Sequence, residues 1–380
     1  MSAANDLVHT SAVKKSPENN ASAPTLLGLE VMRFICALAV LLWHYQHFYM
    51  VGPMTANLAH EHSVQPWSTW LAPFFGHGWL GVQAFWALSG FIFFWKYGQP
   101  IARGTVAPGR FAWLRFSRLY PLHLLTLLAM LPLIAWYRAQ TGQDYVYANN
   151  DLPHFVLQLF LASDWAGRSD WSFNGPIWSI SIEVLAYAVF FALSRLGWVR
   201  PWQIGAVILA TGVVYALKLT PHPLVLCLFF FYLGGLTHAV WARAQSATAA
   251  QRRLLHGVMV AALAASTALV ASGALRPMFY MAALAPLGML LLLTWVQPRS
   301  PRVSRWLGTL GHTTYASYLL HFPLQLLVAN LSGADPSSLP LASPAWLLGY
   351  LAVTFGLAAL TYRAFEAPAQ RWLRQWAERR

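Results

Sequence analysis

The sequence predicts an all-α polytopic membrane protein with about ten transmembrane helices, one short re-entrant or interfacial helix, and both termini in the cytoplasm. Hydrophobic residues make up 57% of the 380 residues, whereas Asp, Glu, Lys and Arg together make up only 10%. Soluble domains carry about a quarter charged residues. Apolar runs of transmembrane length recur along the chain, and basic residues cluster in every second segment that connects these runs. These observations exclude a disordered chain, a disulfide-rich secreted fold and an ordinary cytosolic enzyme.

Ten apolar runs define the predicted spans, because a helix needs about 20 such residues to cross the hydrocarbon core. They are 27–49, 79–96, 117–137, 176–195, 202–219, 223–242, 254–273, 277–296, 311–330 and 345–365. The apolar stretch 155–162 is too short to span, so we expect a re-entrant or interfacial helix there. Residues 1–25 are expected to form a disordered cytoplasmic tail, residues 26–366 the transmembrane domain, and residues 367–380 a basic cytoplasmic tail.

The distribution of basic residues predicts the orientation of the spans. With a cytoplasmic N-terminus, all but four of the 25 Lys and Arg residues fall on the inner side, as the positive-inside rule requires. The exceptions are Arg138, Arg168, Lys218 and Arg276. The formal net charge of +13 is therefore mainly a topology signal, and we expect no nucleic acid partner. Two long loops, 50–78 and 138–174, are expected on the outer side, either as simple connectors or as part of an acceptor site.

Glu183 stands out among the 12 acidic residues, because the other eleven map to tails, loops or span ends. It lies about 12 Å below the outer end of its span at 1.5 Å per residue. Ser179, Glu183 and Tyr187 are spaced four residues apart, so they form one polar stripe on an apolar helix. Glu183 is either a functional group or a buried hydrogen-bonding post between helices.

Arg33 and His44 form a second candidate pair in the first span. Eleven residues bring them onto nearly the same helical face, about 16 Å apart along the axis. A cation near the cytoplasmic side can hold phosphates, and a deeper His can act as a general base. The alternatives are snorkelling of Arg33 to the interface and a helix–helix hydrogen bond from His44.

Three further segments add polar groups to the predicted spans. Arg115 and Arg118 lie on one helical face and suit nucleotide phosphates, although such a run is also typical of a topology anchor. Ser89 and Gly90 allow close approach of backbones in the middle of a span. The segment 312–323 carries Tyr315, Tyr318 and His321, either as part of a site or as a packed Tyr/His seam.

These motifs, taken in order, resemble the acyltransferase-3 family of bacterial integral-membrane O-acyltransferases. The resemblance runs from about Leu26 to Glu366. It rests on Arg33 with His44, on Ser89-Gly90-Phe91, on Arg115-x-x-Arg118 followed by Leu-Tyr-Pro, on Trp178-Ser-Ile-Ser-Ile-Glu183 with Tyr187, and on Tyr315-Ala-Ser-Tyr318-Leu-Leu-His321.

The resemblance implies transfer of an acyl group, expected to be acetyl, from cytoplasmic acyl-CoA to a hydroxyl of a carbohydrate acceptor outside. It implies an enzyme of the bacterial cytoplasmic (inner) membrane, with acyl-CoA as co-substrate, membrane lipid around it, and no metal or other cofactor. His44 would be the catalytic base. Glu183 would support either His44 or the acceptor hydroxyl. Arg33, Arg115 and Arg118 would bind acyl-CoA. Six further motif residues are expected to support the site or bind the acceptor: Ser89, Trp178, Ser181, Tyr187, Tyr318 and His321.

Two other functions fit parts of the sequence. Ten spans with a buried acid also suit a proton-coupled transporter or flippase of a glycan or lipid-linked intermediate, although the prolines in the spans show no symmetry between halves. A membrane scaffold is the other alternative, but it does not require Glu183 and His44 at similar depth.

Overall fold

The protein folds into helices throughout the part of the chain that the structure describes. This computed structural model describes residues 26–54, 62–167, 170–297 and 300–379. Within these ranges there is no β-strand, only an isolated bridge between Pro53 and Val146. The α-helices are α1 (Leu27–His44), α2 (Ser68–His77), α3 (Gly81–Phe93), α4 (Gln99–Ala102), α5 (Pro108–Thr141), α6 (Leu152–Leu159), α7 (Trp178–Arg195), α8 (Pro201–Ala216), α9 (Pro223–Ala244), α10 (Ala249–Ala271), α11 (Pro277–Trp295), α12 (Pro301–Leu331), α13 (Pro344–Thr361) and α14 (Ala367–Glu378). Short 3-10 or π segments extend several of them, including η1 (Tyr45–Tyr49), η6 (Gly175–Ile177) and η8 (Tyr362–Glu366).

Each of the ten predicted apolar runs coincides with a helix, which confirms the all-α polytopic fold class. Among the described residues, eight helical stretches are long and apolar enough to cross a membrane. They are Leu27–Tyr49, Ser68–Ala102, Pro108–Thr141, Gly175–Arg195, Pro223–Ala244, Ala249–Ala271, Pro277–Trp295 and Pro344–Glu378. The sequence therefore predicts two membrane spans more than these eight. The remaining two runs correspond to α8, which has only 16 residues, and α12, whose 31 residues include two Arg and many polar side chains.

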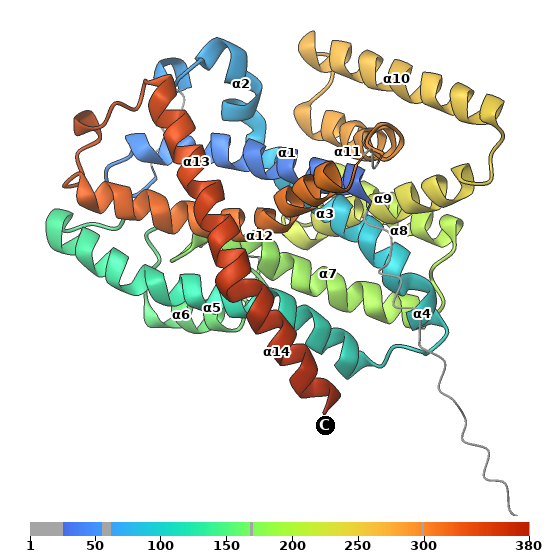
Figure 1. Ribbon diagram of the computed structural model, residues 1–380, viewed down its shortest axis with the longest axis horizontal. Coiled ribbons are helices and arrows are strands. Elements are labelled where there is room, and N and C mark those ends of the chain that lie inside the picture. Colours follow the sequence, from blue (N-terminus) through green and yellow to red (C-terminus); the bar gives the residue numbers. More distant parts are fainter. Residues whose placement is uncertain (1–25, 55–61, 168–169, 298–299, 380) are drawn as a thin grey trace, which may run out of the picture.

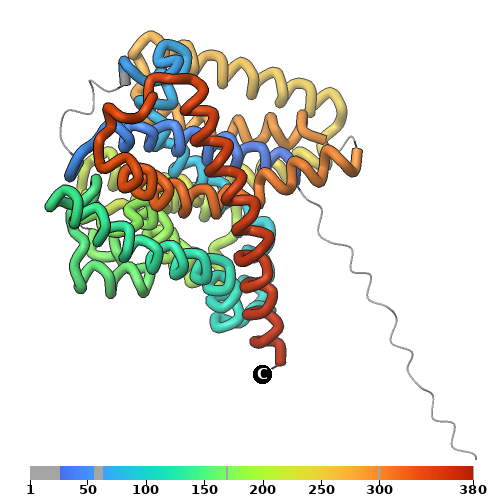
Figure 2. The backbone as a smooth tube through the Cα atoms, turned by 60° about the vertical axis from the view of Figure 1, so that its left-hand side comes forward, coloured from blue at the N-terminus to red at the C-terminus, as the bar shows by residue number. Residues whose placement is uncertain are grey.

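Helices α1, α3 and α12 lie in the middle of the molecule, with α5 and α7 on one side of them and α10 at the opposite edge (Figure 1). Only 6% of the apolar stretch of α10 is buried within the protein. Helices α13 and α14 continue into each other through η8 and cross one face of the molecule as a long rod (Figure 2). The polar helix α12 packs against α1, α5 and α13, which explains why its hydropathy is low: much of its surface faces protein instead of lipid.

The contact between α3 and α9 depends on two glycines that allow the backbones to meet. A Cβ atom on Gly90 would lie 1.7 Å from the carbonyl oxygen of Phe231, and one on Gly234 would lie 1.8 Å from that of Ala87. Small residues permit this kind of close approach between membrane helices. In the pair Ser89-Gly90, the glycine therefore serves the packing of α3 against α9.

The sequence also makes predictions for the two terminal segments and for the short apolar stretch near 155–162. The predicted tail 1–25 lies outside the described residues. The segment 367–380, expected as a basic tail, forms α14 as far as Glu378 and packs on α5, where the Trp113 indole donates a hydrogen bond of 2.9 Å to the Leu373 carbonyl. The short apolar stretch near 155–162 contains most of α6, whose N-terminus is capped by Asp151.

Candidate functional site

A cavity of about 160 Å³ lies between α1, α3, α5, α7 and α12. This volume has room for several water molecules or for part of an organic ligand. Seven of the eleven predicted site residues line it: Arg33, Ser89, Arg115, Arg118, Glu183, Tyr187 and Tyr318. Ser179, Thr314 and Tyr315 add further polar groups, and apolar side chains such as Phe85, Trp86 and Phe93 form much of the remaining wall. The structure therefore gathers residues that the sequence places on five separate spans.

Glu183 sits on the wall contributed by α7, within the polar stripe that the helical spacing predicts. All three members of that stripe, Ser179, Glu183 and Tyr187, face the cavity. The Glu183 carboxylate accepts hydrogen bonds from Ser89 and Tyr187. Its Oε1 atom has no hydrogen-bond partner among the described residues. A buried acceptor left unpaired is costly, so this oxygen is a candidate contact for a ligand or water in the cavity.

Two of the three arginines that line the cavity are balanced by carboxylates. Arg33 pairs with Glu30 one turn earlier on α1, at 3.2 Å. Arg118 pairs with Glu366 from η8, whose side chain is only 2% exposed. The Arg118 guanidinium also lies over the Tyr315 ring, 5.2 Å from its centroid.

Arg115 differs from these two arginines because its partners are aromatic. Its guanidinium lies 4.9 Å from the centroid of the Phe93 ring and 5.1 Å from that of Tyr97. It donates a hydrogen bond of 2.8 Å to the Tyr97 hydroxyl, while its Nε atom is buried without a partner in the described part of the chain. Of the three arginines of the cavity, Arg115 is therefore the one that makes no ion pair in the described chain, which leaves its charge available to an anionic ligand.

His44 does not line this cavity; it belongs to a cluster of three imidazoles. Its ring centroid lies 4.9 Å from that of His47 and 4.6 Å from that of His321. His44 is 6% exposed, and the other two rings are fully buried. The described His, Cys, Asp and Glu residues include no group of three or more arranged to hold a metal ion.

The hydrogen bond made by His44 determines which ring nitrogen can act as a base. Nδ1 lies 2.9 Å from the carbonyl oxygen of Val40, one turn earlier on α1. A carbonyl oxygen only accepts hydrogen bonds, so Nδ1 carries the hydrogen and, in the neutral ring, the lone pair is on Nε2. This is the form that a general base needs.

Tyr318 connects the histidine cluster to the cavity. It lines the cavity, and its ring centroid is 5.9 Å from that of His321 one turn later on α12. Its hydroxyl lies 2.7 Å from the Ser179 hydroxyl and donates to the Pro176 carbonyl at 2.8 Å. Tyr318 therefore forms the wall between the arginine-lined cavity and the three imidazoles.

The structure places two predicted site residues away from both features. Trp178 packs edge-on against Trp86, 5.8 Å between centroids. Ser181 faces the loop before α7, where its hydroxyl accepts a hydrogen bond from the backbone N–H of Asp164. Burial raises the pKa of the Asp164 carboxyl to about 6. The expected contact between Glu183 and His44 is also not formed in the described residues, because the carboxylate faces the cavity and the imidazole faces the cluster.

Several residues of these features were not singled out from the sequence, among them Thr314 on the cavity wall. His47 follows His44 by three residues, a helical spacing that could have identified it. Gln325, whose side-chain amide oxygen lies 3.2 Å from His47 Nδ1, follows His321 by four residues on α12, with the same signal. Glu366 lay at the edge of the predicted tail, and only its contact with Arg118 shows its place in the site.

The two features together suit transfer between an anionic donor and a neutral acceptor. The cavity offers an incompletely balanced cation, a carboxylate and hydroxyl groups, with apolar walls for the remainder of a ligand. The imidazole cluster offers a ring nitrogen with a free lone pair beyond Tyr318. A cation holds phosphate groups well, and a neutral imidazole is suited to remove a proton from a hydroxyl.

Comparison with known proteins gives one family match and one partial relative. The profile of the family Acyl_transf_3, described as an acyltransferase domain, matches residues 26–363. A region of 83 residues is 40% identical to "Protein 2 in picA locus" of Rhizobium radiobacter. This region is 21% of the present chain and 39% of that protein, so the similarity covers well under half of the relative. No solved structure matches the chain significantly.

Proposed function

This chain belongs to the acyltransferase-3 family, and from this premise we propose that it transfers an acetyl group from acetyl-CoA to a hydroxyl of a carbohydrate. The observation that carries the proposal is the tautomer of His44. Its Nδ1–H is held by the Val40 carbonyl, so its Nε2 lone pair is available next to a cavity lined by arginines. A base of this kind and a nearby anion-binding cavity are what a thioester donor and a hydroxyl acceptor require.

In the proposed reaction, the acyl group passes directly from the thioester sulfur to the acceptor oxygen. His44 Nε2 takes the proton of the acceptor hydroxyl, and the oxygen attacks the thioester carbonyl carbon. The new C–O bond forms as the C–S bond breaks, and the sulfur leaves with the bonding electron pair. The CoA thiolate then takes up a proton, so the products are the ester and free CoA. His44 returns to its neutral form when it gives its proton back to the medium or to the thiolate.

The cavity is the proposed donor site. Arg115 binds the phosphates of CoA, and the paired Arg33 and Arg118 contribute hydrogen-bond donors to the same wall. The lining of the cavity from Arg115 to Tyr318 leads from the cation toward the histidine cluster. Glu183, which contacts Ser89 and Tyr187, belongs to this donor side, so we assign it a role in holding the acyl-CoA and not in orienting His44.

The location of the enzyme follows the same proposal. The segments that carry Arg115 and Arg118 lie on the side predicted to be cytoplasmic, where acyl-CoA is made, and the loop after α5 lies at the other end of that helix. At 1.5 Å per residue, the 34 residues of α5 span about 50 Å. We propose a multi-pass protein of the bacterial inner membrane with cytoplasmic termini and a carbohydrate acceptor on the outer side.

The test uses purified protein in lipid nanodiscs with radiolabelled acetyl-CoA and de-O-acetylated glycan from the source organism. His44→Asn keeps an N–H donor for the Val40 carbonyl but lacks the basic Nε2. We expect it to lower kcat about 100- to 10,000-fold, with an unchanged KM for acetyl-CoA. His256→Asn, on the peripheral helix α10, is the matched control and is expected to retain wild-type turnover.

Two results would count against the proposal. Full turnover by His44→Asn removes the assignment of the base. Absence of any label transfer to glycan by the wild-type protein, at acetyl-CoA concentrations that saturate binding, contradicts the function itself.

A further inference from the structure

His47 is a buried imidazole beside the proposed base, and the reaction described above leaves it without a role. Its side chain is fully buried, and its ring centroid lies 4.9 Å from that of His44. Residues three apart on a helical turn share a face, which is why the two rings meet. Any hydroxyl group that reaches Nε2 of His44 therefore comes close to the His47 ring as well.

Gln325 fixes the tautomer of His47. Its Nε2 atom donates a hydrogen bond of 2.8 Å to the backbone carbonyl of His44, so its Oε1 atom is the one that faces His47 Nδ1, at 3.2 Å. Because an amide oxygen only accepts, His47 Nδ1 carries the hydrogen and the neutral ring has its lone pair on Nε2. That Nε2 atom has no hydrogen-bond partner in the described chain.

Two neighbouring imidazoles thus present hydrogen-bond acceptors without a donor between them. Neither nitrogen of His321, whose ring centroid lies 4.6 Å from that of His44, makes a well-directed hydrogen bond within the described residues, although the Ser317 and Tyr318 carbonyls lie beside it. Buried acceptors are normally satisfied. The arrangement calls for a ligand that brings more than one O–H group to the same place.

We propose that His47 Nε2 accepts a hydrogen bond from the hydroxyl adjacent to the one that His44 deprotonates. The site then selects an acceptor with two neighbouring hydroxyl groups, which is the vicinal diol of a sugar ring. This inference rests on the proposed function and adds a binding role: His47 forms no covalent bond and moves no proton, and Gln325 is the positioning residue that fixes its ring.

Aromatic side chains form the wall of this diol subsite. Tyr145 donates a hydrogen bond of 2.7 Å to the His47 carbonyl, and the Tyr147 ring lies edge-on to the His47 ring, 5.8 Å between centroids. The backbone between the two tyrosines is unusual, since Val146 has a φ of 60°, a conformation that β-branched residues rarely adopt. An apolar wall beside two acceptors suits a sugar ring, which has C–H groups on its faces and hydroxyls at its edge.

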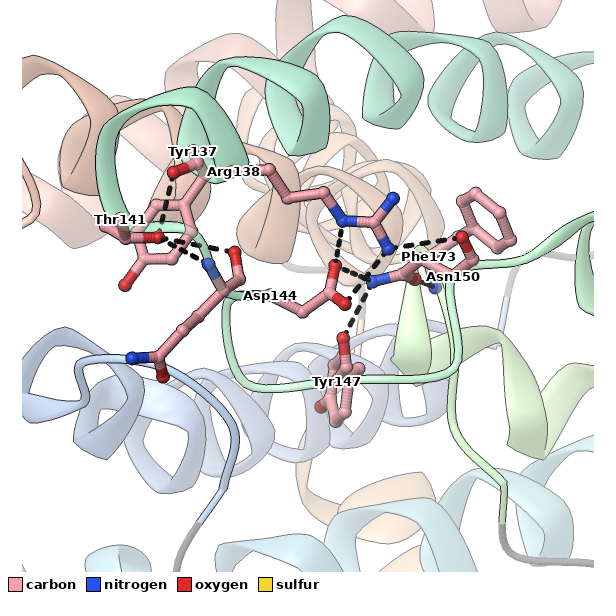
Figure 3. Close-up of polar contacts among 8 residues, drawn as sticks. Tyr137, Arg138, Thr141, Asp144, Tyr147, Asn150 and Phe173 are labelled. Carbon is pink, nitrogen blue, oxygen red and sulfur yellow. Dashed lines mark hydrogen bonds and ion pairs between the residues drawn. The ribbon is translucent and has the colours of Figure 1, made fainter.

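The loop that carries these tyrosines is held in place by a polar network (Figure 3). Arg138, near the end of α5, makes two hydrogen bonds to the Asp144 carboxylate, at 2.8 and 2.9 Å. The Asn150 side chain donates to Asp144 and to the Tyr147 carbonyl, and the Arg138 guanidinium also donates to the Asn150 carbonyl. The network fixes the position of Tyr147 against His47, so the wall of the subsite is part of the fold.

The experiment measures acetyl transfer from acetyl-CoA to methyl glucoside and to its monodeoxy derivatives, using the full-length protein in nanodiscs. For the wild type, removal of the hydroxyl next to the acetylated position is expected to lower kcat/KM for the acceptor at least about tenfold, because a buried acceptor is then left unpaired. Removal of a distant hydroxyl is expected to have little effect. KM for acetyl-CoA is measured in parallel and is expected to stay constant.

Two variants of His47 make the test specific. His47→Asn keeps an N–H donor for Gln325 but lacks the Nε2 acceptor, so its kcat/KM for the diol should fall to the wild-type value for the deoxy derivative. His47→Gln extends an amide oxygen to the position of Nε2 and is expected to restore part of the discrimination. Thermal midpoints of both variants show that they are folded.

Each outcome bears on one of the two proposals. Equal discrimination by the wild type and His47→Asn, or equal loss of activity toward all acceptors, overturns the diol subsite while the acyltransferase function stands. Discrimination that disappears in His47→Asn and returns in His47→Gln supports it. Transfer of label to the de-O-acetylated glycan but to none of the glycosides overturns the diol subsite as the basis of acceptor selection, whereas transfer to neither contradicts the proposed function.

Discussion

The ion pair between Arg118 and Glu366 offers the sharpest test of how the site is held together. It joins α5 to the segment that links α13 with α14. The Glu366 side chain is 2% exposed and that of Arg118 is 26% exposed. The Oε2 atom of Glu366 has no other partner in the described chain. Loss of Arg118 would therefore leave a carboxylate buried without a counter-charge, whereas loss of Glu366 leaves a cation that can still reach the cavity.

The expected magnitude follows from this asymmetry. Removal of one partner of a buried ion pair costs about 3–5 kcal/mol. For a chain of 380 residues, an unfolding entropy of about 2 cal/mol/K per residue converts this loss into a fall in thermal midpoint of roughly 5 °C. We expect Arg118→Gln to reach this value and Glu366→Gln to fall short of it. The double variant, which removes both charges, should recover most of the loss because no buried charge is left alone.

The assay is the thermal midpoint of the purified protein in detergent, followed by size-exclusion chromatography of heated samples. Arg371→Gln serves as the control, since Arg371 is an exposed residue on the adjoining helix α14. Equal midpoints for Arg118→Gln and the wild type, or a double variant no more stable than Arg118→Gln, would show that the buried ion pair does not stabilise the fold in this way. Arg118 would then be a binding residue without a structural role.

Three further predictions address the proposed donor site, the loop before α7 and the helix packing. Arg115→Gln should raise KM for acetyl-CoA about 10- to 100-fold, since a hydrogen bond to a charged group contributes roughly 1.5–3 kcal/mol; isothermal titration with CoA would show an unchanged Kd if the assignment is wrong. Because the folded pKa of Asp164, about 6, exceeds the unfolded value, its carboxyl reduces stability progressively from about pH 4 to pH 6. Asp164→Asn should therefore raise the thermal midpoint at pH 8 and leave it unchanged near pH 4, and an equal shift at both pH values would speak against this. Gly90→Ala should abolish folded protein on fluorescence-detected chromatography, because its Cβ would overlap the Phe231 carbonyl, whereas Gly109→Ala, with open space around it, should not; normal yield of the first variant would contradict the packing.

Local physics accounts for the part of this protein that could be predicted from its sequence. Apolar runs of sufficient length form helices in a membrane because all backbone groups are then paired within the helix. The period of the helix also places Ser179, Glu183 and Tyr187 on one face, and the structure turns that face to the cavity. Both conclusions require only residues that are near one another in the chain.

The contacts between spans could not be predicted in this way. The shared face of Arg33 and His44 suggests one site, but the neighbouring helices separate them, so that Arg33 lines the cavity and His44 joins His47 and His321. A helical period states which residues share a face; it does not state which face of another helix lies opposite. Glu366 shows the same limit, because its partner Arg118 lies 248 positions away in the sequence.

Hydrophobicity and polarity along the chain are enough to show that this protein is a bundle of membrane helices, and which residues are too polar to face lipid. The grouping of those residues becomes visible only in the folded protein: a cavity with an arginine that makes no ion pair on one side of Tyr318, and a cluster of imidazoles on the other. The physical reason is that hydrophobicity and helical period act along the chain, whereas the pairing of charges, the tautomers of His44 and His47 and the closure of a cavity depend on atoms brought together from distant spans.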